Sequence, residues 1–195
     1  MATTNIPGYT YGSADLKKSP VSLDDFAKLK QATLFGDDDV RYLKMSHDIL
    51  KDQTEQILDV WYGFVGSTPF LLHYFTNDGQ PNMDYLGAVR KRFGQWILDT
   101  ANANYDQNWL NYQHEIGLRH HSTKKNKTDN VKAVPIIHVH YIFALLIPIT
   151  TTLRPFLEKG GHSRDDVDRM QDAWRKSVLM QVILWSQPYI KEGEF

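Results

Sequence analysis

Apolar residues recur every three or four positions along most of the chain, which is the spacing of one face of an α-helix. The clearest example is residues 82–102, where they share a stripe about 120° wide and charged residues lie outside it. No stretch of six or more residues alternates between apolar and polar side chains, as a half-buried strand would. The pattern therefore predicts an all-α protein. The stripe comprises Tyr85, Leu86, Val89, Phe93, Trp96, Ile97 and Thr100.

Breaks in this periodicity predict where the first helices begin and end. Residues 1–20 show no periodicity and predict an extended N-terminal arm packed on the body, after which Ser22 caps a short helix. Residues 37–66 open with three aspartates, which favour a helix N-terminus, and are long enough for two helices with a bend near residues 46–48. The sequence GSTP ends the second of them. PFLLHYF predicts a short helix or turn, and NDGQPN predicts a loop.

The second half of the chain predicts three further helices. Residues 107–121 and 131–158 are periodic, with Pro135 near the start of the longer segment and Pro148 placed to kink it. The last helix is predicted to begin after a capping Ser163 and to end at Pro188. In all, we expect seven or eight helices. The buried stripe of the last helix would be Val167, Met170, Trp174, Val178, Val182 and Trp185.

Composition is that of a globular protein and excludes several kinds of site. The chain is long enough for one domain, residues 1–195, with a sizeable core. Its net charge of −1 gives no field that favours nucleic acid, and no apolar run suits a membrane span or signal peptide. Cysteine is absent, so disulfides and thiolate sites are excluded and we expect a cytoplasmic protein. Aromatic residues make up 12% of the chain, which suits either a well-packed core or one built around a flat apolar guest.

The segment YQHEIGLRHH raises the question of which histidine points inward. At about 100° per residue, His120 falls on the apolar face of its helix, whereas His114 and His121 fall on the opposite flank. A lone histidine on an apolar face is usually a core residue with a satisfied ring nitrogen. It is also nearly all that haem iron needs from a protein, provided that a flat apolar slot surrounds it. The pattern alone leaves both interpretations open. The apolar face comprises Trp109, Tyr112 and Ile116.

Other candidate sites are weaker. His138 and His140 lie two positions apart, about 200° round a helix, so they could not chelate one ion there. The aspartates at 37–39 are better explained as partners of a helix dipole. The basic loop KKNK is best explained as a solvated turn, although it could also lie near an anionic group of a cofactor. The sequence contains no phosphate-binding glycine loop, nucleophile elbow or zincin motif.

Several motifs together resemble the protoglobins, single-domain relatives of the globin-coupled sensors. They are DVWYGFVGS, VRKRFGQWILDT, YDQNWLNYQHEIGLRHHSTKKNKTDNV and TTLRPFL, and the likeness extends from the IPGYTYG arm to the closing LWSQPYIKEGEF. The resemblance implies a globin-like helical sandwich with an extra N-terminal helix and a pre-helical arm. It also implies a deeply buried haem b that binds O2, CO and NO, and a homodimer formed through the last two long helices.

The same resemblance implies roles for particular residues. The iron ligand would be the first histidine of LRHH, which is His120, the residue that helical phase places inward. Trp61 and Tyr62 of WYG and Phe93 of RKRF would form the distal side of the haem. Val89 lies one turn before Phe93, where many globins carry a distal histidine. Because valine cannot donate a hydrogen bond to bound oxygen, Tyr62 is the expected distal donor.

A further match and two departures concern the shape of the pocket and the dimer. Phe75 of HYF resembles the family's haem-packing phenylalanine. Ala101 follows ILDT, where some relatives carry cysteine, so no covalent dimer can form there. Leu145 and Ile147 stand where several relatives carry aromatic residues, which alters the shape expected for the distal pocket and for any gas tunnels.

Three classes of function remain open. The first is a protein that reversibly binds diatomic gases, as a gas binder or sensor. The second is a haem enzyme with nitric oxide dioxygenation, nitrite or peroxide chemistry, and the third is a helical interaction module without a cofactor. We favour the first, because we see no fused reductase domain and no charged acid–base pair over the distal face. Any electrons or signal would then pass through a separate redox or signalling partner.

Overall fold

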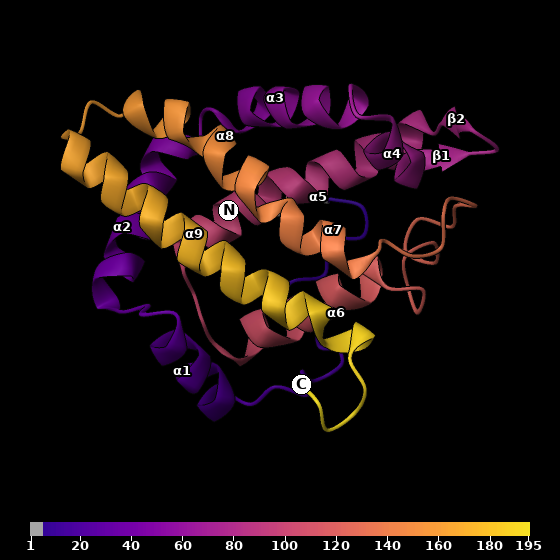
Figure 1. Ribbon diagram of the computed structural model, residues 1–195, viewed down its shortest axis with the longest axis horizontal. Coiled ribbons are helices and arrows are strands. Elements are labelled where there is room, and N and C mark those ends of the chain that lie inside the picture. Colours follow the sequence, from indigo (N-terminus) through magenta and orange to yellow (C-terminus); the bar gives the residue numbers. More distant parts are fainter. Residues whose placement is uncertain (1–5) are drawn as a thin grey trace.

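The computed structural model describes residues 6–195, which are mainly helical apart from one short hairpin (Figure 1). The all-α prediction is confirmed. Residues 1–5, the start of the predicted arm, lie outside the described residues. The helices are α1 (Leu23–Ala32), α2 (Asp37–Leu50), α3 (Thr54–Gly66), α4 (Pro69–Leu72), α5 (Met83–Asn102), α6 (Gln107–His120), α7 (Val139–Ala144), α8 (Leu146–Glu158) and α9 (Arg164–Ser186), with 3-10 turns η1 (His73–Phe75) and η2 (Gln187–Tyr189).

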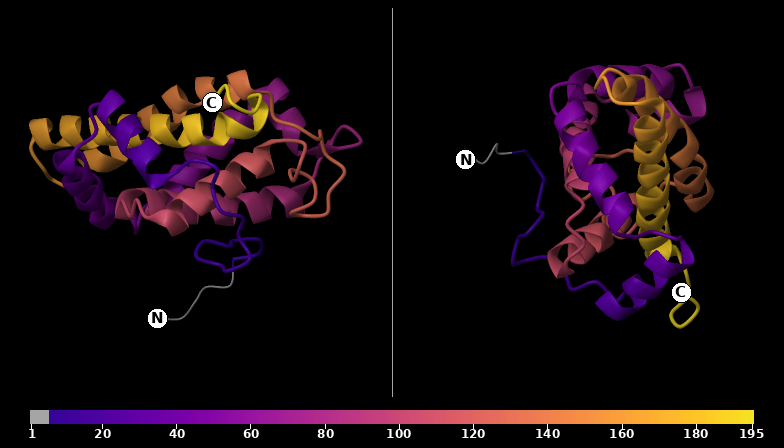
Figure 2. Two further views of the ribbon diagram at one scale, coloured as in Figure 1. Left: turned by 90° about the horizontal axis from the view of Figure 1, so that it is seen from below. Right: turned by 90° about the vertical axis from the view of Figure 1, so that its left-hand side faces the viewer.

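The helices form two layers, and α9 is the helix that joins them. In Figure 2, α8 and α9 lie in one layer above α5 and α6 in the other. Helix α9 packs against α8, α2, α6, α7 and α5. Its predicted apolar stripe is buried along its whole length, because each turn presents one or two of these side chains to the core. The buried residues are Val167, Met170, Trp174, Val178, Val182 and Trp185.

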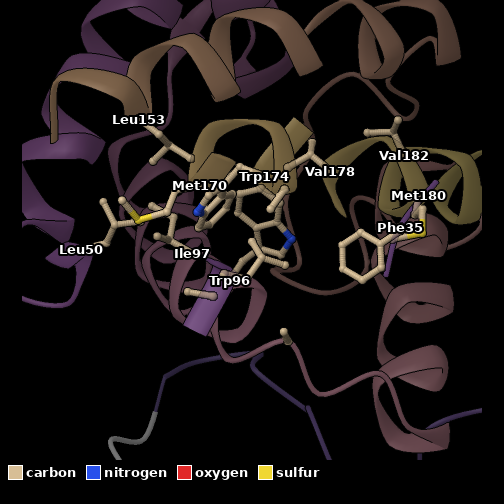
Figure 3. Close-up of a cluster of buried hydrophobic side chains, with 14 of the residues drawn as sticks. Phe35, Leu50, Trp96, Ile97, Leu153, Met170, Trp174, Val178, Met180 and Val182 are labelled. Carbon is tan, nitrogen blue, oxygen red and sulfur yellow. The ribbon is translucent and has the colours of Figure 1, made fainter. Parts of the chain in front are cut away.

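Buried polar side chains hold the indoles of the core. Nε1 of Trp174 donates to Oγ of Ser46 at 2.9 Å, and Nε1 of Trp96 donates to Oε1 of Gln181 at 2.7 Å; Figure 3 shows both indoles. Each bond satisfies an N–H that would otherwise be buried without a partner. Trp174 and Trp185 are both buried within the chain, so neither side chain is available to contact a partner molecule.

The break between α2 and α3 falls later than the bend predicted at residues 46–48, because α2 continues to Leu50. Ser46 is accommodated within the helix, since its hydroxyl donates to the carbonyl of Leu43 at 2.6 Å. A serine that bonds back to the preceding turn can remain in a continuous helix. The same hydroxyl accepts the indole N–H described above, so a tertiary contact fixes it there.

The long helix predicted over residues 131–158 begins only at Val139. Tertiary hydrogen bonds replace the helical ones in the segment before it. Ile137 donates its N–H to the carbonyl of His120 at 2.9 Å, and its own carbonyl accepts the hydroxyl of Tyr189 at 2.7 Å. These partners lie far away in sequence, so a local pattern of apolar residues cannot reveal them.

The kink predicted at Pro148 appears as a break in the helix at Leu145. Proline has no N–H to donate to the carbonyl one turn earlier, which belongs to Ala144, and α7 ends at that residue. By length and composition, Val139–Glu158 is the one stretch of residues 6–195 that could cross a membrane. The break divides this stretch, and both of its helices pack against α9.

The loop NDGQPN contains a short antiparallel hairpin of β1 (Thr76–Asn77) and β2 (Gln80–Pro81). The two residues between the strands, Asp78 and Gly79, have φ values of 48° and 78°. Positive φ at both positions is typical of a type I′ turn, which matches the twist of a two-residue hairpin.

Helices α6 and α9 approach each other closely at Gly117. A Cβ added at this position would lie 3.0 Å from the carbonyl oxygen and 3.1 Å from the Cα of Trp185. Both are backbone atoms, which cannot swing aside as the end of a flexible side chain can. Any side chain at position 117 would therefore push the two helices apart.

We predict that Gly117→Ala destabilises the protein, although alanine is the better helix former. The gain in helix propensity is about 1 kcal/mol, whereas overpacking a close contact costs about 1–3 kcal/mol. Gly63→Ala on α3 is the matched control, because nothing lies within 4 Å of a Cβ there. Urea unfolding of the two variants measures the difference, and equal stability would contradict the close approach.

Candidate functional site

A large internal cavity lies between α3, α5, α6, α9 and the α7–α8 segment. Its void is about 220 Å³, whereas one water needs only about 10–15 Å³. Folded proteins keep few voids larger than a water molecule, so a cavity of this size has room for a guest. All the residues that the sequence suggested for a cofactor site line it: Trp61, Tyr62, Phe75, Val89, Phe93 and His120.

One wall of the cavity is apolar and comes mainly from α3 and α5. The rings of Trp61 and Phe93 meet edge to face with centroids 5.7 Å apart, and those of Tyr62 and Phe93 with centroids 6.5 Å apart. Val89, one turn before Phe93, lies in the same wall, and Leu145 adds an aliphatic surface between α7 and α8. These side chains present flat apolar surfaces to whatever fills the cavity.

Tyr62 brings a hydroxyl to this wall. Burial raises the pKa of its phenol, although the nearby cation of Arg90 opposes the shift, so the phenol stays protonated at neutral pH and can donate. Arg90 does not line the cavity; its guanidinium lies 5.7 Å from the centre of the Tyr62 ring and bonds to Glu55 and Asp59 at 2.8 Å each. Tyr62 thus lies between the cavity and a cluster of ion pairs.

His120, the last residue of α6, is held by two neighbours. Its Nδ1 lies 2.8 Å from the carbonyl oxygen of Ile116, so Nδ1 carries the proton and Nε2 keeps its lone pair. The imidazole stacks on the indole of Trp185, with centroids 5.3 Å apart and 11° between the ring planes. That indole in turn donates to Oε1 of the buried Gln113 at 2.7 Å. A carbonyl and an indole therefore fix the orientation of the imidazole.

The surroundings of His120 also favour its neutral form. Burial lowers the pKa of the imidazole, the hydrogen bond to Ile116 opposes this shift, and the cations of Lys125 and Arg119 add to it. The ring is therefore neutral at pH 7, which is the form that ligates a metal.

The other histidines of this segment do not line the cavity. His121 bonds through Nδ1 to the hydroxyl of Thr123 at 2.7 Å and lies edge-on to the ring of Tyr189. His114 is half-buried, and burial lowers its pKa. Within residues 6–195 no group of three or more His, Asp or Glu side chains could hold a metal ion. A metal in the cavity would therefore need a cofactor to supply most of its ligands.

Another part of the lining is basic. Arg92 forms a two-bond ion pair with Asp129, at 2.9 and 2.6 Å, and Arg119 pairs with the buried Glu115 at 2.8 Å. Lys125 differs from these arginines, because its hydrogen bonds go to neutral oxygens, the carbonyl of Tyr74 at 3.1 Å and Oδ1 of its neighbour Asn126 at 3.5 Å. Its ammonium also lies 5.4 Å from the centre of the Tyr85 ring.

Lys125 corrects the expectation that KKNK is a solvated turn. It is only 2% exposed and lines the cavity, and burial lowers the pKa of its ammonium to about 8. The charge of Asp129 opposes this shift in pKa without forming an ion pair with the ammonium. A buried cation that bonds to no carboxylate is costly, so the site favours an anionic group on the guest.

The N-terminal arm covers this basic part of the cavity. Arg92 donates to the carbonyl of Pro7 at 2.8 Å, and Arg119 donates to the carbonyl of Gly8 and to the hydroxyl of Thr10. Gly8 has a φ of 74°, and a Cβ there would lie 2.7 Å from the Arg92 guanidinium, so the close approach requires glycine. Further contacts are a 2.7 Å bond from Tyr9 to Asp99 and stacking of Tyr11 on Tyr112.

Comparison with known proteins identifies the family. The model of the protoglobin family matches residues 22–195. The chain belongs to the protoglobin family. The globin domain of a globin-coupled sensor from Geobacter sulfurreducens has the same fold, with a TM-score of 0.66 and 14% identity over 85% of this chain and 97% of that domain. A search of curated proteins finds no match. The globin-like sandwich predicted from the motifs is confirmed.

Membership of a globin family implies haem, and the cavity of this protoglobin suits that group. Haem is a flat apolar ring with two carboxylates at one edge. The cavity combines aromatic walls, a basic part at Arg92, Arg119 and Lys125, and one neutral imidazole with a free Nε2. The lining therefore suits haem in apolar character, charge and ligand type.

Sequence reasoning missed several residues of this pocket. Trp185 was predicted only as part of a buried stripe, yet it supports the imidazole of His120. Arg92 follows two other basic residues in VRKRF, and nothing in that run distinguishes the one that faces inward. Gly8 of IPGYTYG was the signal that the sequence offered for the close contact of the arm, because glycine lets another group approach the backbone.

The ion pairs of Glu115 predict that the stability of the fold decreases in acid. Burial raises the pKa of this carboxyl, but hydrogen bonds from Lys124 and Arg119 outweigh it and hold the pKa below its ordinary 4.5. A carboxyl whose pKa is lower in the folded state stabilises the fold above its unfolded pKa, and this stabilisation is lost as the pH falls through the folded value.

We therefore expect Glu115→Gln to lower the free energy of unfolding by about 1–3 kcal/mol at pH 7, because it leaves a buried cationic partner poorly satisfied. The difference from the parent should shrink towards pH 4, where the parent's own carboxyl begins to protonate. Urea unfolding at both pH values measures this, with Glu55→Gln, whose side chain is 80% exposed, as a control that should change little. A difference that is the same at both pH values would contradict the assignment.

Proposed function

We propose that this protoglobin binds haem b through His120 and that the iron reversibly takes up O2, CO or NO, as a gas binder or sensor. The observation that carries the proposal is the neutral imidazole of His120, with Nε2 free, inside a large apolar cavity. When bound, haem would supply an iron that can take a diatomic gas. The residues of the chain do the rest: they hold the haem, exclude water and contact the gas.

Each part of the lining has a separate task in this proposal. Trp61, Phe75 and Phe93 pack against the ring, and Lys125 with the two arginines balances its carboxylates. The side chain closest in role to a globin's distal histidine is Tyr62. Val89 and Phe93 have no hydrogen-bond donor, and the Trp61 indole packs edge to face with Phe93. No acid–base pair is seen among the described residues of this wall, which favours holding a gas over converting it. Enzymatic nitric oxide, nitrite or peroxide chemistry is therefore the second candidate.

His120→Ala should greatly reduce haem retention and change the visible absorption spectrum, because no other described histidine lines the cavity. Added imidazole should partly restore the spectrum by replacing the missing ligand. His121→Ala is the matched control one residue away and should keep the parent spectrum. If His121→Ala loses haem while His120→Ala retains it, the proposed ligand is wrong.

Tyr62→Phe should speed the release of O2 by about five- to thirty-fold, which corresponds to losing one hydrogen bond of about 1–2 kcal/mol to a polarised ligand. CO is less polar, so its release should change less. Trp61→Ala should instead open space and speed the arrival of both gases. Stopped-flow and flash photolysis measure these rates, and an unchanged O2 off-rate in Tyr62→Phe would mean that its hydroxyl points away from the ligand.

We also propose that the protein is a cytoplasmic homodimer that works with a separate redox or signalling partner. Support for the dimer comes from apolar side chains exposed on consecutive helices: Phe143 on α7 is 40% exposed, Ile147 on α8 is 63% exposed and Leu179 on α9 is 36% exposed. A second copy would remove this surface from water. In this proposal these residues, rather than Trp174 and Trp185, face the partner.

Ile147→Glu should shift the sedimentation mass from twice the 22.6 kDa of one chain towards the monomer, because it would bury a charge in the interface. Met83→Glu, on a residue 72% exposed at the start of α5, is the control and should remain dimeric. A parent protein that sediments as a monomer at micromolar concentration would refute the dimer.

A further inference from the structure

Two aromatic residues separate the internal cavity from a hollow on the surface. Tyr74 in η1 and Tyr141 in α7 line the cavity, and both also line the hollow, which is otherwise formed by α4, η1 and the start of α7. These elements lie towards the end of the molecule that carries the β hairpin (Figure 1). The rings of Tyr74 and Tyr141 thus separate the proposed haem site from the surface of the protein. The hollow is lined by Pro69, Phe70, His73, Tyr74, His138, His140 and Tyr141.

The hydroxyl of Tyr74 has a base beside it. It lies 2.7 Å from Nδ1 of His138, and no other tyrosine among residues 6–195 is seen to bond to a histidine. Tyr74 is 6% exposed, whereas His138 is exposed, so the bond leads from a buried phenol to an accessible imidazole. The ring of His138 stacks on that of His140, with centroids 5.7 Å apart, and His140 lies 4.2 Å from the ring of Tyr141. The helical spacing of HVH does not apply here, because His138 precedes α7 in extended chain.

This arrangement suits the removal of an electron from a phenol. An oxidised phenol loses its proton readily, so oxidation is easiest where a base is already hydrogen-bonded to the hydroxyl. Tyr62 lies in the apolar wall formed by α3 and α5, and it has the cation of Arg90 beside its ring rather than a base at its hydroxyl. The described side chains that line the hollow include aromatic rings and imidazoles but no carboxylate, lysine or arginine. Such a surface suits a small uncharged aromatic molecule.

We propose that the hollow binds a phenol or hydroquinone and that Tyr74 and His138 pass its electrons to the cavity when the protein reduces a hydroperoxide. This inference rests on the proposed haem site. The overall reaction is ROOH + 2 ArOH → ROH + H2O + 2 ArO•. In each half, Tyr74 would give one electron to the hydroperoxide through the haem held in the cavity, while its O–H bond breaks and a new N–H bond forms at Nδ1 of His138. The phenol in the hollow then reduces Tyr74 and loses its own proton to water, and the proton on His138 returns to the tyrosine oxygen.

The first test looks for the radical. The haem-loaded parent, Tyr74→Phe and Tyr85→Phe are mixed with one equivalent of hydrogen peroxide, frozen rapidly and examined by electron paramagnetic resonance. Tyr85 is the control, because it is a buried tyrosine of the same cavity that does not line the hollow. We expect a tyrosyl signal in the parent and in Tyr85→Phe, and its loss in Tyr74→Phe. An equal signal in Tyr74→Phe would overturn the proposal, and faster CO uptake in that variant would then identify Tyr74 as a gate for gases.

The second test examines the base and the hollow. His138→Phe should slow hydroquinone oxidation by roughly 100-fold, the lower range for a positioned proton acceptor, without changing the haem spectrum. Hydroquinone added to the protein without peroxide should shift the imidazole nuclear magnetic resonance signals of His138 and His140 but not that of His121. Unshifted signals at both histidines would overturn the binding site. A chain that takes up no haem would refute the proposed function, whereas a loaded chain that fails these tests would refute this inference alone.

Discussion

The close contact between α6 and α9 determines the geometry around His120. Gln113, Gly117 and His120 lie on one side of α6, at spacings of four and three residues. The missing side chain at Gly117 lets the backbone of Trp185 come within contact distance, and the indole then reaches both Gln113 and the imidazole. The contact between α6 and α9 therefore sets the plane of the His120 imidazole, while the carbonyl of Ile116 on α6 sets its tautomer.

Charge in the cavity places a second demand on the fold. Burying three cations beside an apolar void is unfavourable unless each finds a partner. Two arginines find carboxylates and arm carbonyls, which ties the order of the arm to the lining of the cavity. Lys125 hydrogen-bonds only to neutral oxygens, and the nearby charge of Asp129 offsets the effect of its burial only in part. A carboxylate-bearing guest would correct the imbalance left at Lys125, so the electrostatics of the cavity support the proposed cofactor.

How much could be predicted from the sequence depends on the range of the interactions. The inward position of His120 follows from helical phase alone, because its neighbours on α6 are set by local spacing. The helix over residues 131–138 was wrongly predicted, because the partners of Ile137 come from His120 and Tyr189. The burial of Lys125 was missed for the same reason, since the chain around it reads as polar. Interactions between segments distant in sequence, rather than propensity, decided these cases.

Tyr62 and Tyr74, two of the tyrosines that line the cavity, show how the surroundings of one side-chain type can separate two roles. Tyr62 has a guanidinium near its ring, and a positive charge there opposes loss of an electron while leaving the hydroxyl free to donate. Tyr74 has an imidazole at its hydroxyl, which can accept the proton that an oxidised phenol releases. A gas-binding site needs a donor that is not consumed, and a route for electrons needs a residue that can be oxidised and restored. One cavity contains both kinds of tyrosine, because Tyr62 lies beside the cation of Arg90 and Tyr74 bonds to the imidazole of His138.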